Sequence, residues 1–322
     1  MALIPNTGPM PNTGRVPNTE FHPELRRSAR LLPKQLITPG TVPIIRVAGR
    51  LLRRHDPDDP KAPEVLTLPS GVEVRLHRPA GSAAPGPALL WLHGGGYVVG
   101  DAAQDDELCR RFASELGATI ASVNYRLAPE HPYPAPVEDC YSALVWLSGL
   151  PSVDPARVAI GGASAGGGLA AALALLTRDR GEIALSAQLL VYPMLDDRTV
   201  LRTDIDDAGH RLWNQSSNKF GWRAYLGAAD PNVAVPARRE DLAGLPPAWI
   251  GVGTLDLFHD EDLAYAERLR AADVPCEVMV VAGAFHGFDG IMPKASVSQS
   301  FFASQCELLK TAFTPVQSEA TE

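Results

Sequence analysis

Cysteine is scarce in this sequence, and the few that occur are widely separated. Only four are present among 322 residues, and no two of them form a C-x-x-C pair. This spacing indicates neither a zinc site nor a disulfide framework. We therefore expect reduced, buried thiols at Cys109, Cys140, Cys276 and Cys306.

Long apolar runs and blocks of positive charge are also missing. No run approaches the ~20 apolar residues of a membrane-spanning helix. The 29 lysines and arginines are outnumbered by 37 acidic residues, which gives a net charge of −8. We therefore expect no nucleic-acid partner and no membrane partner. The N-terminus lacks a basic segment followed by an apolar one, which predicts a cytoplasmic protein.

Apolar, strand-like segments alternate with amphipathic helical ones along most of the chain. This alternation predicts an α/β fold in which a mostly parallel, eight-stranded sheet carries helices on both faces. The first two strands are expected to form an antiparallel edge. The predicted strands cover residues 65–68, 72–78, 88–93, 118–124, 158–160, 188–192, 248–253 and 277–281.

Two segments fall outside this alternation and are predicted to form a helical lid. Residues 21–54, with apolar positions interrupted by prolines, predict one or two short amphipathic helices and the N-terminal part of the lid. Residues 197–232 form the predicted lid insertion, with two aromatic-bearing helical pieces around 210–226. Residues 1–20 repeat the motif PNTG and predict a flexible tail. The predicted core consists of residues 55–196 and 233–322.

The chain's most informative stretch is a strand-like segment that runs through glycines into an Ala/Leu-rich helix. Within it, Gly162, Ser164 and Gly166 satisfy the pattern G-x-S-x-G. This pattern is typical of a nucleophile elbow, a sharp strand-to-helix turn that lifts the serine above the edge of the sheet. The flanking glycines are needed because strand and helix backbones approach too closely there for a Cβ. A phosphate-binding loop is excluded, since no lysine stands at the required offset.

A second glycine cluster follows the strand at 88–93. Three glycines in succession after a buried strand expose backbone N–H groups, as an oxyanion hole requires. This loop, at 94–96, and the amide of Ala165 directly after the elbow serine are therefore the predicted sources of the oxyanion donors.

Two later strands end on residues that could complete a catalytic triad. Ligands bind beyond the carboxyl ends of strands in open parallel sheets, so residues directly after strands are candidates. Asp256 follows one such strand and His286 the next, and the order Ser164, Asp256, His286 is that of an α/β-hydrolase triad. Gly287 gives the histidine room to turn towards the serine. The rival acids are Asp196, Asp197, Asp260 and Glu261, of which the last two more plausibly begin a helix.

These motifs together resemble the hormone-sensitive-lipase-like carboxylesterases, the bacterial family IV esterases. The resemblance covers about residues 60–313. Its motifs are HGGGY at 93–97, YRLAPEHPYPA at 125–135, GASAGG at 162–167, YPMLD at 192–196, DLFHDE at 256–261 and HGF at 286–288. It implies that Ser164 is the nucleophile, His286 the base and Asp256 its partner. It also implies that the amides of Gly94, Gly95 and Ala165 are the oxyanion donors. Two positions depart from the family pattern: Ala163 stands where an acid or threonine is usual, and Gly168 where asparagine is common.

The predicted function is hydrolysis of small carboxylic esters with short- to medium-chain acyl groups through a serine acyl-enzyme. No metal or organic cofactor is expected, and a homodimer is allowed. Two alternatives stay open: an amide, lactone or peptide hydrolase using the same triad, or a non-catalytic ligand-binding member of the fold. His286 speaks against the second alternative. Glu130 and Glu138, in and after the proline-rich loop, are expected to brace the elbow rather than to catalyse.

Overall fold

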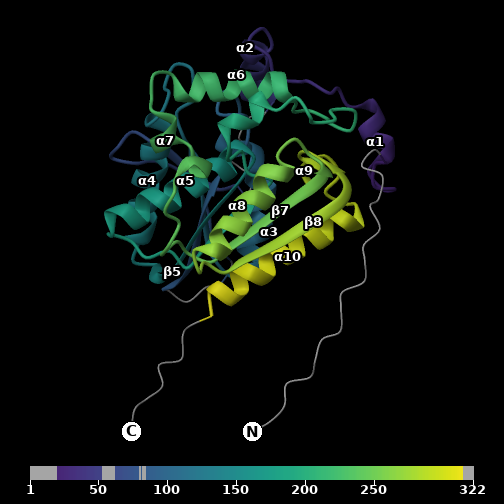
Figure 1. The fold of residues 1–322 in the computed structure, drawn as a ribbon. Coiled ribbons are helices and arrows are strands. Elements are labelled where there is room, and N and C mark those ends of the chain that lie inside the picture. The colour runs from purple at the N-terminus through teal and green to yellow at the C-terminus, as the bar shows by residue number, and fades with distance from the viewer. Residues whose placement is uncertain (1–19, 53–61, 80, 82–84, 315–322) are drawn as a thin grey trace, which may run out of the picture.

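The computed structural model describes residues 20–52, 62–79, 81 and 85–314. They build one eight-stranded sheet in the order β1-β2-β4-β3-β5-β6-β7-β8 (Figure 1). β1 and β2 form an antiparallel edge, β2 is also antiparallel to β4, and the remaining pairs are parallel. This arrangement confirms the predicted fold class. The strands are β1 Glu64–Thr67, β2 Glu73–His77, β3 Gly86–Leu92, β4 Thr119–Asn124, β5 Val153–Ala163, β6 Ala187–Val191, β7 Ala248–Leu255 and β8 Cys276–Phe285.

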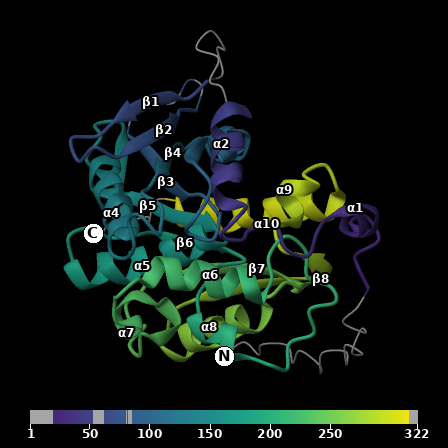
Figure 2. The ribbon, with the colours of Figure 1, turned by 90° about the horizontal axis from the view of Figure 1, so that it is seen from above.

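Helices cover both faces of the sheet, because the apolar strands need burial on each side. Two buried side-chain clusters mark the two faces. One contains apolar residues of α4 (Ala135–Ser148), α5 (Ala165–Arg180) and α8 (His259–Ala271). The other contains apolar residues of α3 (Asp106–Leu116) and α10 (Ser296–Ala312), and includes Phe288 of the short α9 (Phe288–Ile291). Figure 2 shows α4, α5 and α8 on one side of the strands and α9 and α10 on the other.

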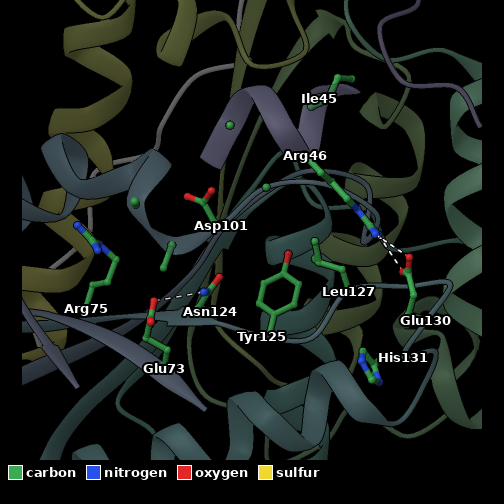
Figure 3. A pocket seen from close by; sticks show the side chains of 14 residues that line it. Ile45, Arg46, Glu73, Arg75, Asp101, Asn124, Tyr125, Leu127, Glu130 and His131 are labelled. Carbon is green, nitrogen blue, oxygen red and sulfur yellow. Dashed lines mark hydrogen bonds and ion pairs between the residues drawn. The ribbon is translucent and has the colours of Figure 1, made fainter. Parts of the chain in front are cut away.

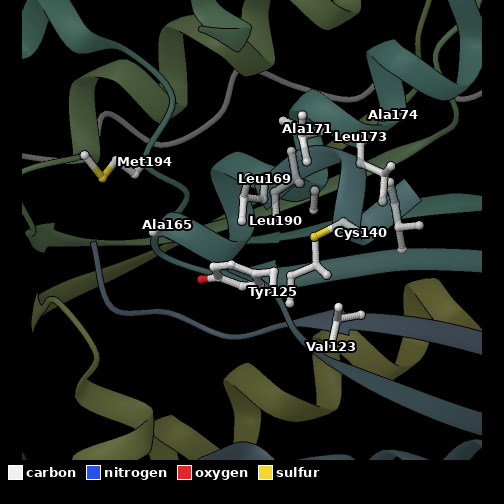
Figure 4. Close-up of a cluster of buried hydrophobic side chains, with 14 of the residues drawn as sticks. Val123, Tyr125, Cys140, Ala165, Leu169, Ala171, Leu173, Ala174, Leu190 and Met194 are labelled. Atoms are coloured by element: carbon white, nitrogen blue, oxygen red, sulfur yellow. The ribbon is translucent and has the colours of Figure 1, made fainter. Parts of the chain in front are cut away.

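The elbow helix α5 lies at the centre of the first cluster. Its small and apolar residues from Ala165 to Ala174 are buried, except for the partly buried Ala172. Figure 4 shows Leu169 near Leu190 of β6, and Cys140 of α4 near Tyr125. A helix of alanine and glycine can approach a sheet closely. This close approach fixes how far Ser164, the residue before the helix, stands above the sheet. α5 is therefore a rigid base for Ser164.

The region of the predicted lid insertion is only partly helical. It contains the 3₁₀ turn η2 (Asp197–Leu201), the helix α6 (Gln215–Leu226) and the first residues of α7 (Pro231–Ala234). The expectation of two helical pieces within residues 210–226 was wrong, since a single helix, α6, occupies that stretch. Leu212 has a φ of +67°, which a helix cannot contain, and Asn214 caps α6 by accepting a hydrogen bond from Ser217 N at 3.0 Å. Two other short 3₁₀ turns lie outside the insertion. They are η1 (Ala102–Asp105) and η3 (Pro236–Arg238).

The N-terminal segment forms two short helices, as its sequence predicts. These are α1 (Arg26–Leu31) and α2 (Val42–Leu52). The chain between them passes beside α6 (Figure 1). The predicted tail, apart from Glu20, and residues 55–61 at the start of the predicted core lie outside the described residues. All four cysteines are free thiols, but Cys276 is half-exposed rather than buried, because it begins the edge strand β8.

Candidate active site

The elbow has the strained geometry that its glycines permit. Ser164 sits between β5 and α5 with φ 58° and ψ −121°, a conformation rare for any residue with a side chain. A Cβ on Gly162 would lie 2.4 Å from Gly166 O, and one on Gly166 would lie 2.0 Å from Leu92 O. Only glycine fits at either position, so the sequence pattern follows directly from the close approach of β3, β5 and α5.

The three predicted triad residues meet above the carboxyl ends of β5, β7 and β8. His286 Nε2 lies 2.9 Å from Ser164 Oγ, and His286 Nδ1 lies 2.8 Å from Asp256 Oδ2. All three residues are buried, with relative exposures of 6%, 4% and 8% for Ser164, Asp256 and His286. Asp256 Oδ1 also accepts a hydrogen bond from Phe258 N at 3.0 Å, so both carboxylate oxygens are engaged. Since a carboxylate only accepts, Nδ1 carries the proton and Nε2 faces the serine hydroxyl as an acceptor.

Two aromatic rings hold the imidazole of His286. The rings of Tyr192 and Phe258 meet it edge-on, with centroid distances of 4.8 and 5.2 Å. Tyr192 Oη donates a 2.8 Å hydrogen bond to Asp289, one turn beyond His286. Burial raises the pKa of Asp289 above its ordinary value. None of the motif arguments identified Tyr192 or Asp289 as part of the site, although both lie inside or beside quoted motifs.

The glycine loop after β3 lies against the elbow. A Cβ on Gly94 would lie 3.4 Å from Ser164 Cβ, so this residue borders the nucleophile. Tyr125 Oη donates to His93 O at 2.6 Å, and His93 Nδ1 lies 2.8 Å from Gly94 O. In a trans peptide the N–H points away from the carbonyl, so these anchored carbonyls fix the directions of the Gly94 and Gly95 N–H groups. Both groups are therefore held in place before any substrate binds.

The departure at Gly168 has a physical cause in this chain. A Cβ there would lie 2.4 Å from Tyr97 Oη and 2.2 Å from Met194 O. Tyr97 Oη donates to Met194 O at 3.2 Å and occupies the space that a larger residue would need. The Met194 backbone and the Tyr97 hydroxyl thus each leave no space for a Cβ at residue 168. Nothing in the structure explains Ala163.

The rival acids have other partners. Asp196 caps η2 and pairs with Arg198 at 2.8 Å. Asp260 and Glu261 lie in the first turn of α8, as predicted. Glu138 pairs with Arg180 at the end of α5, 2.7 Å away, and so does brace the elbow helix. The expectation that Glu130 does the same was wrong, because its carboxylate instead pairs with Arg46 of α2 at 2.8 Å.

The segment at 197–232 packs directly on the glycine loop. A Cβ on Gly96 would lie 2.1 Å from the Trp213 ring, and one on Gly221 of α6 would lie 2.9 Å from Gly96 O. A Cβ on Gly287, the residue after His286, would lie 3.8 Å from the Leu212 side chain. Trp213 is 3% exposed. This segment therefore covers both the predicted oxyanion hole and the histidine.

Two cavities border the site without containing the serine. One, of about 190 Å³, lies behind Asp256 and is lined by His210, Asp260 and neighbouring residues. The other, of about 530 Å³, lies beside the glycine loop and is lined by Arg46, Gly100, Tyr125 and others (Figure 3). Over the residues that the structure describes, no group of three or more His, Cys, Asp or Glu side chains could hold a metal ion. No helix within the same ranges is long and apolar enough to cross a membrane.

Comparison with known proteins agrees with this geometry. A family model described as an alpha/beta hydrolase fold matches residues 89–290. Esterase LipI of Mycobacterium tuberculosis is 36% identical over 268 residues, which span 77% of this chain and 84% of LipI. Carboxylesterase NlhH of the same species is 36% identical over 232 residues, spanning 67% and 71% of the two chains. The solved esterase LipW of Mycobacterium marinum has a TM-score of 0.83 at 34% identity, covering 93% of this chain and 98% of LipW.

This chain belongs to the α/β-hydrolase family and, within it, to the hormone-sensitive-lipase-like carboxylesterases. The family prediction is thereby confirmed. The prediction of a carboxylic-ester hydrolase is confirmed as well, since the relatives are named for that activity.

Proposed function

We propose that the protein hydrolyses small carboxylic esters with short- to medium-chain acyl groups, using Ser164 as nucleophile, His286 as base and Asp256 as its partner. The observation that carries this proposal is the continuous hydrogen-bonded row from Asp256 through His286 to Ser164, with contacts of 2.8 and 2.9 Å. Its position on a strained elbow directs the serine towards the glycine loop.

The reaction follows from this arrangement. Ser164 Oγ attacks the ester carbonyl while His286 Nε2 accepts its proton, and Asp256 stabilises the resulting imidazolium. The N–H groups of Gly94, Gly95 and Ala165 stabilise the negative oxygen of the tetrahedral intermediate. His286 then donates the proton to the leaving alcohol. Water attacks the acyl-enzyme in the same way and releases the acid. The reaction needs neither a metal nor an organic cofactor.

The proposed acyl-chain range rests on the two segments assigned to the lid, residues 21–54 and 197–232. Trp213 lies directly above the glycine loop, and Leu212 lies beside Gly287. Space next to the serine is therefore small, and long acyl chains would require these side chains to move. We infer a preference for acyl groups of about C2–C8.

A panel of p-nitrophenyl esters from acetate to palmitate tests this function. We expect hydrolysis of the short esters, inactivation by a serine-directed organophosphate, and little turnover of palmitate. Ser164→Ala and His286→Ala should each lower kcat by roughly 10³-fold or more, with unchanged circular dichroism. Faster cleavage of matched anilides or lactones than of the esters would instead favour an amide or lactone hydrolase. Activity that survives Ser164→Ala would refute the mechanism.

The setting of the enzyme also belongs to this proposal. We infer a cytoplasmic location from the sequence, which also allows a homodimer. Cell fractionation and analytical ultracentrifugation of the full chain test these two inferences.

A further inference from the structure

The loop that follows β3 is held in an unusual backbone conformation. Gly95, Gly96 and Gly100 have φ values of +128°, +60° and +100°. Tyr97 has a φ of +65° and shares the left-handed region although it carries a side chain. Such a residue stays there only where its surroundings hold it. The contacts that hold residues 95–99 therefore help to set the position of Gly95, together with the anchored carbonyl of Gly94 on its other side.

Gly95 and the far end of this loop form one tight turn. The amides of Val98 and Val99 both donate to Gly95 O, at 3.1 and 3.0 Å. A Cβ on Gly95 would lie 2.0 Å from Val99 O, so the backbones are in direct contact. Since packed groups transmit displacement, a shift of Val98 or Val99 moves Gly95 as well.

Arg46 of α2 holds this far end. Its Nε donates to Val98 O at 2.8 Å and its Nη2 to Ala128 O at 2.7 Å. Its Nη1 and Nη2 donate to the carboxylate of Glu130 at 2.8 and 3.1 Å, and Figure 3 shows the side chain extending from its helix to that residue. Ala128 N in turn donates to Tyr97 O at 2.9 Å. One guanidinium thus joins α2 to two loops that come from the ends of β3 and β4.

The contacts to backbone carbonyls matter more than the ion pair. Val98 and Ala128 are fully buried, so without Arg46 their carbonyls would have to find partners through the cavity that Arg46 lines. The Glu130 side chain is 57% exposed, and water screens its attraction to Arg46. The main effect of Arg46 is therefore on the backbone of the loop.

We propose that Arg46 is a positioning residue for the oxyanion hole, through which the docking of α2 sets the backbone of residues 95–99. This inference rests on the proposed ester hydrolysis at Ser164. It adds a second role to the N-terminal segment: besides covering the site, the segment holds one of the groups that stabilise the transition state.

If Arg46 had only a structural role, it would attach α2 to the rest of the fold without affecting the oxyanion hole. Arg211 offers a matched control, because it also ties the N-terminal segment down, there through one backbone carbonyl and one aromatic ring. Its Nε donates to Ala29 O of α1 at 2.5 Å, and its guanidinium carbon lies 4.7 Å from the centroid of the Phe21 ring. None of these three residues belongs to the glycine loop. Loss of Arg211 therefore loosens the segment without releasing the oxyanion hole.

The experiment compares Arg46→Met and Arg211→Met in the full chain. kcat and KM for p-nitrophenyl butyrate are measured below the Tm of each variant. The inhibition constant of an alkyl trifluoromethyl ketone is measured in parallel, because its adduct with the serine places a negative oxygen in the hole. Misplacement of a catalytic group by about 1 Å lowers rates by up to ~10²-fold. We expect Arg46→Met to lower kcat by about 10- to 100-fold and to weaken the inhibitor similarly, with KM within about threefold of the unaltered enzyme.

Arg211→Met should keep kcat and the inhibition constant within about threefold, whatever its effect on Tm. Unaltered kcat and inhibitor affinity in Arg46→Met, a change in KM alone, or equal losses of kcat in both variants would overturn the proposal. If Arg46→Met does not fold, Arg46→Lys decides by the same readouts, since its single nitrogen cannot occupy the separate positions of Nε, Nη1 and Nη2 from which Arg46 bonds the two carbonyls and the carboxylate. Failure of the proposed function is distinct, because the unaltered enzyme would then show no Ser164-dependent turnover at all.

Chemical rescue provides an independent readout. The cavity of about 530 Å³ that Arg46 lines gives a small cation access to the vacated position in Arg46→Ala. Millimolar ethylguanidinium should raise kcat of Arg46→Ala several-fold and leave Arg211→Ala unchanged. Equal responses of the two variants would count against a positioning role.

Discussion

The hydroxyl of Tyr125 donates a 2.6 Å hydrogen bond to the carbonyl of His93, and the two rings stack 4.1 Å apart at an angle of 9°. Tyr125 follows β4, whereas His93 follows β3, so this contact joins neighbouring strand ends. The peptide that it anchors carries the Gly94 N–H, the first donor of the proposed oxyanion hole. Tyr125 thus acts at the near end of the loop, as Arg46 does at the far end.

Tyr125→Phe tests this anchor, since it keeps the stacked ring and removes only the hydroxyl. We expect kcat for a short ester to fall about tenfold with little change in KM, because Gly94 N–H loses its fixed direction. The free energy of unfolding should fall by about 1–3 kcal/mol, since His93 O is left buried without that donor. Tyr141→Phe is the control: its hydroxyl bonds the Glu182 side chain, away from the loop. Equal kcat values for the two variants would remove Tyr125 from the site.

Asp256→Asn separates the proposed acid from its rival Asp196. The introduced amide would favour the wrong tautomer of His286, so kcat should fall by up to ~10⁴-fold while the fold persists. Asp196→Asn should leave kcat nearly unchanged, because Asp196 caps η2 and pairs with Arg198. Both are measured by steady-state hydrolysis of p-nitrophenyl acetate. The reverse pattern would reassign the acid.

Gly166→Ala should disrupt the elbow. The added methyl would lie 2.0 Å from Leu92 O and 2.5 Å from His93 O, and neither backbone group can yield without moving β3. We expect a loss of several kcal/mol of stability, in the range of severe core substitutions, and loss of esterase activity. Gly86→Ala is the matched control, since no atom lies within 4 Å of its added methyl. Thermal melts of the two proteins measure the difference, and similar Tm values would contradict the packing argument.

The predictable parts of this fold are those that local sequence determines. Apolar strand segments, the glycines at 162 and 166, and the positions of Asp256 and His286 just after strands are all local patterns, and the parallel sheet brings their ends together. The single helix at 215–226 could also have been found, because Asn214 is a strong N-cap residue. The aromatic side chains, however, continue upstream of this cap to Trp213, and this pattern favours a helical piece before Asn214 as well.

Contacts between distant segments could not be predicted in this way. Arg46 and Glu130 are 84 residues apart, and nothing near either one indicates the other. The same holds for Tyr192 and Asp289, 97 residues apart, whose pairing depends on how β6 and α9 are packed. The sequence implies no partner base for Glu130 and therefore favours a bracing role at the elbow, whereas in the folded chain Glu130 pairs with Arg46 of α2. These residues support the site rather than define it, and only the tertiary structure identifies them.

Glu261 predicts how stability depends on pH. Its Oε1 accepts hydrogen bonds from Leu195 N and Asp196 N at 2.8 and 3.1 Å, and its Oε2 contacts Thr199 Oγ1. Burial raises the pKa of Glu261 to about 8. Because the folded pKa lies above that of the unfolded chain, the folded state holds a proton that the unfolded state loses above about pH 4.5. The free energy of unfolding should therefore fall between about pH 4.5 and 8, by up to ~1.4 kcal/mol per pH unit.

Glu261→Gln should remove this dependence. Glutamine keeps an oxygen for the two backbone amides and offers an N–H to Thr199, so the contacts survive without a titrating group. Urea unfolding at several pH values should give a flatter profile for Glu261→Gln and higher stability than the unaltered enzyme at pH 8. Glu267→Gln, at an exposed position on the same helix, is the control and should keep the original slope. Identical slopes for all three proteins would show that Glu261 is ionised in the folded state.

Two truncations test the N-terminal segment. Deleting residues 1–20 should leave kcat/KM for a short ester within about twofold, because the remaining segment keeps the hydrogen bond from His22 N to Gly283 O at 2.9 Å. Deleting residues 1–54 also removes buried Leu25, Ala29, Ile37 and Val42, which should lower stability by several kcal/mol. It removes Arg46 as well, so kcat should fall even where the truncated protein remains folded. If the N-terminal segment only limited access to Ser164, its removal would have the opposite effect. The value of kcat would then be unchanged or higher, and longer acyl chains would be tolerated. Steady-state kinetics on acetate, butyrate and octanoate esters at 15–20 °C distinguish these outcomes, since at about this temperature domain stability is near its maximum.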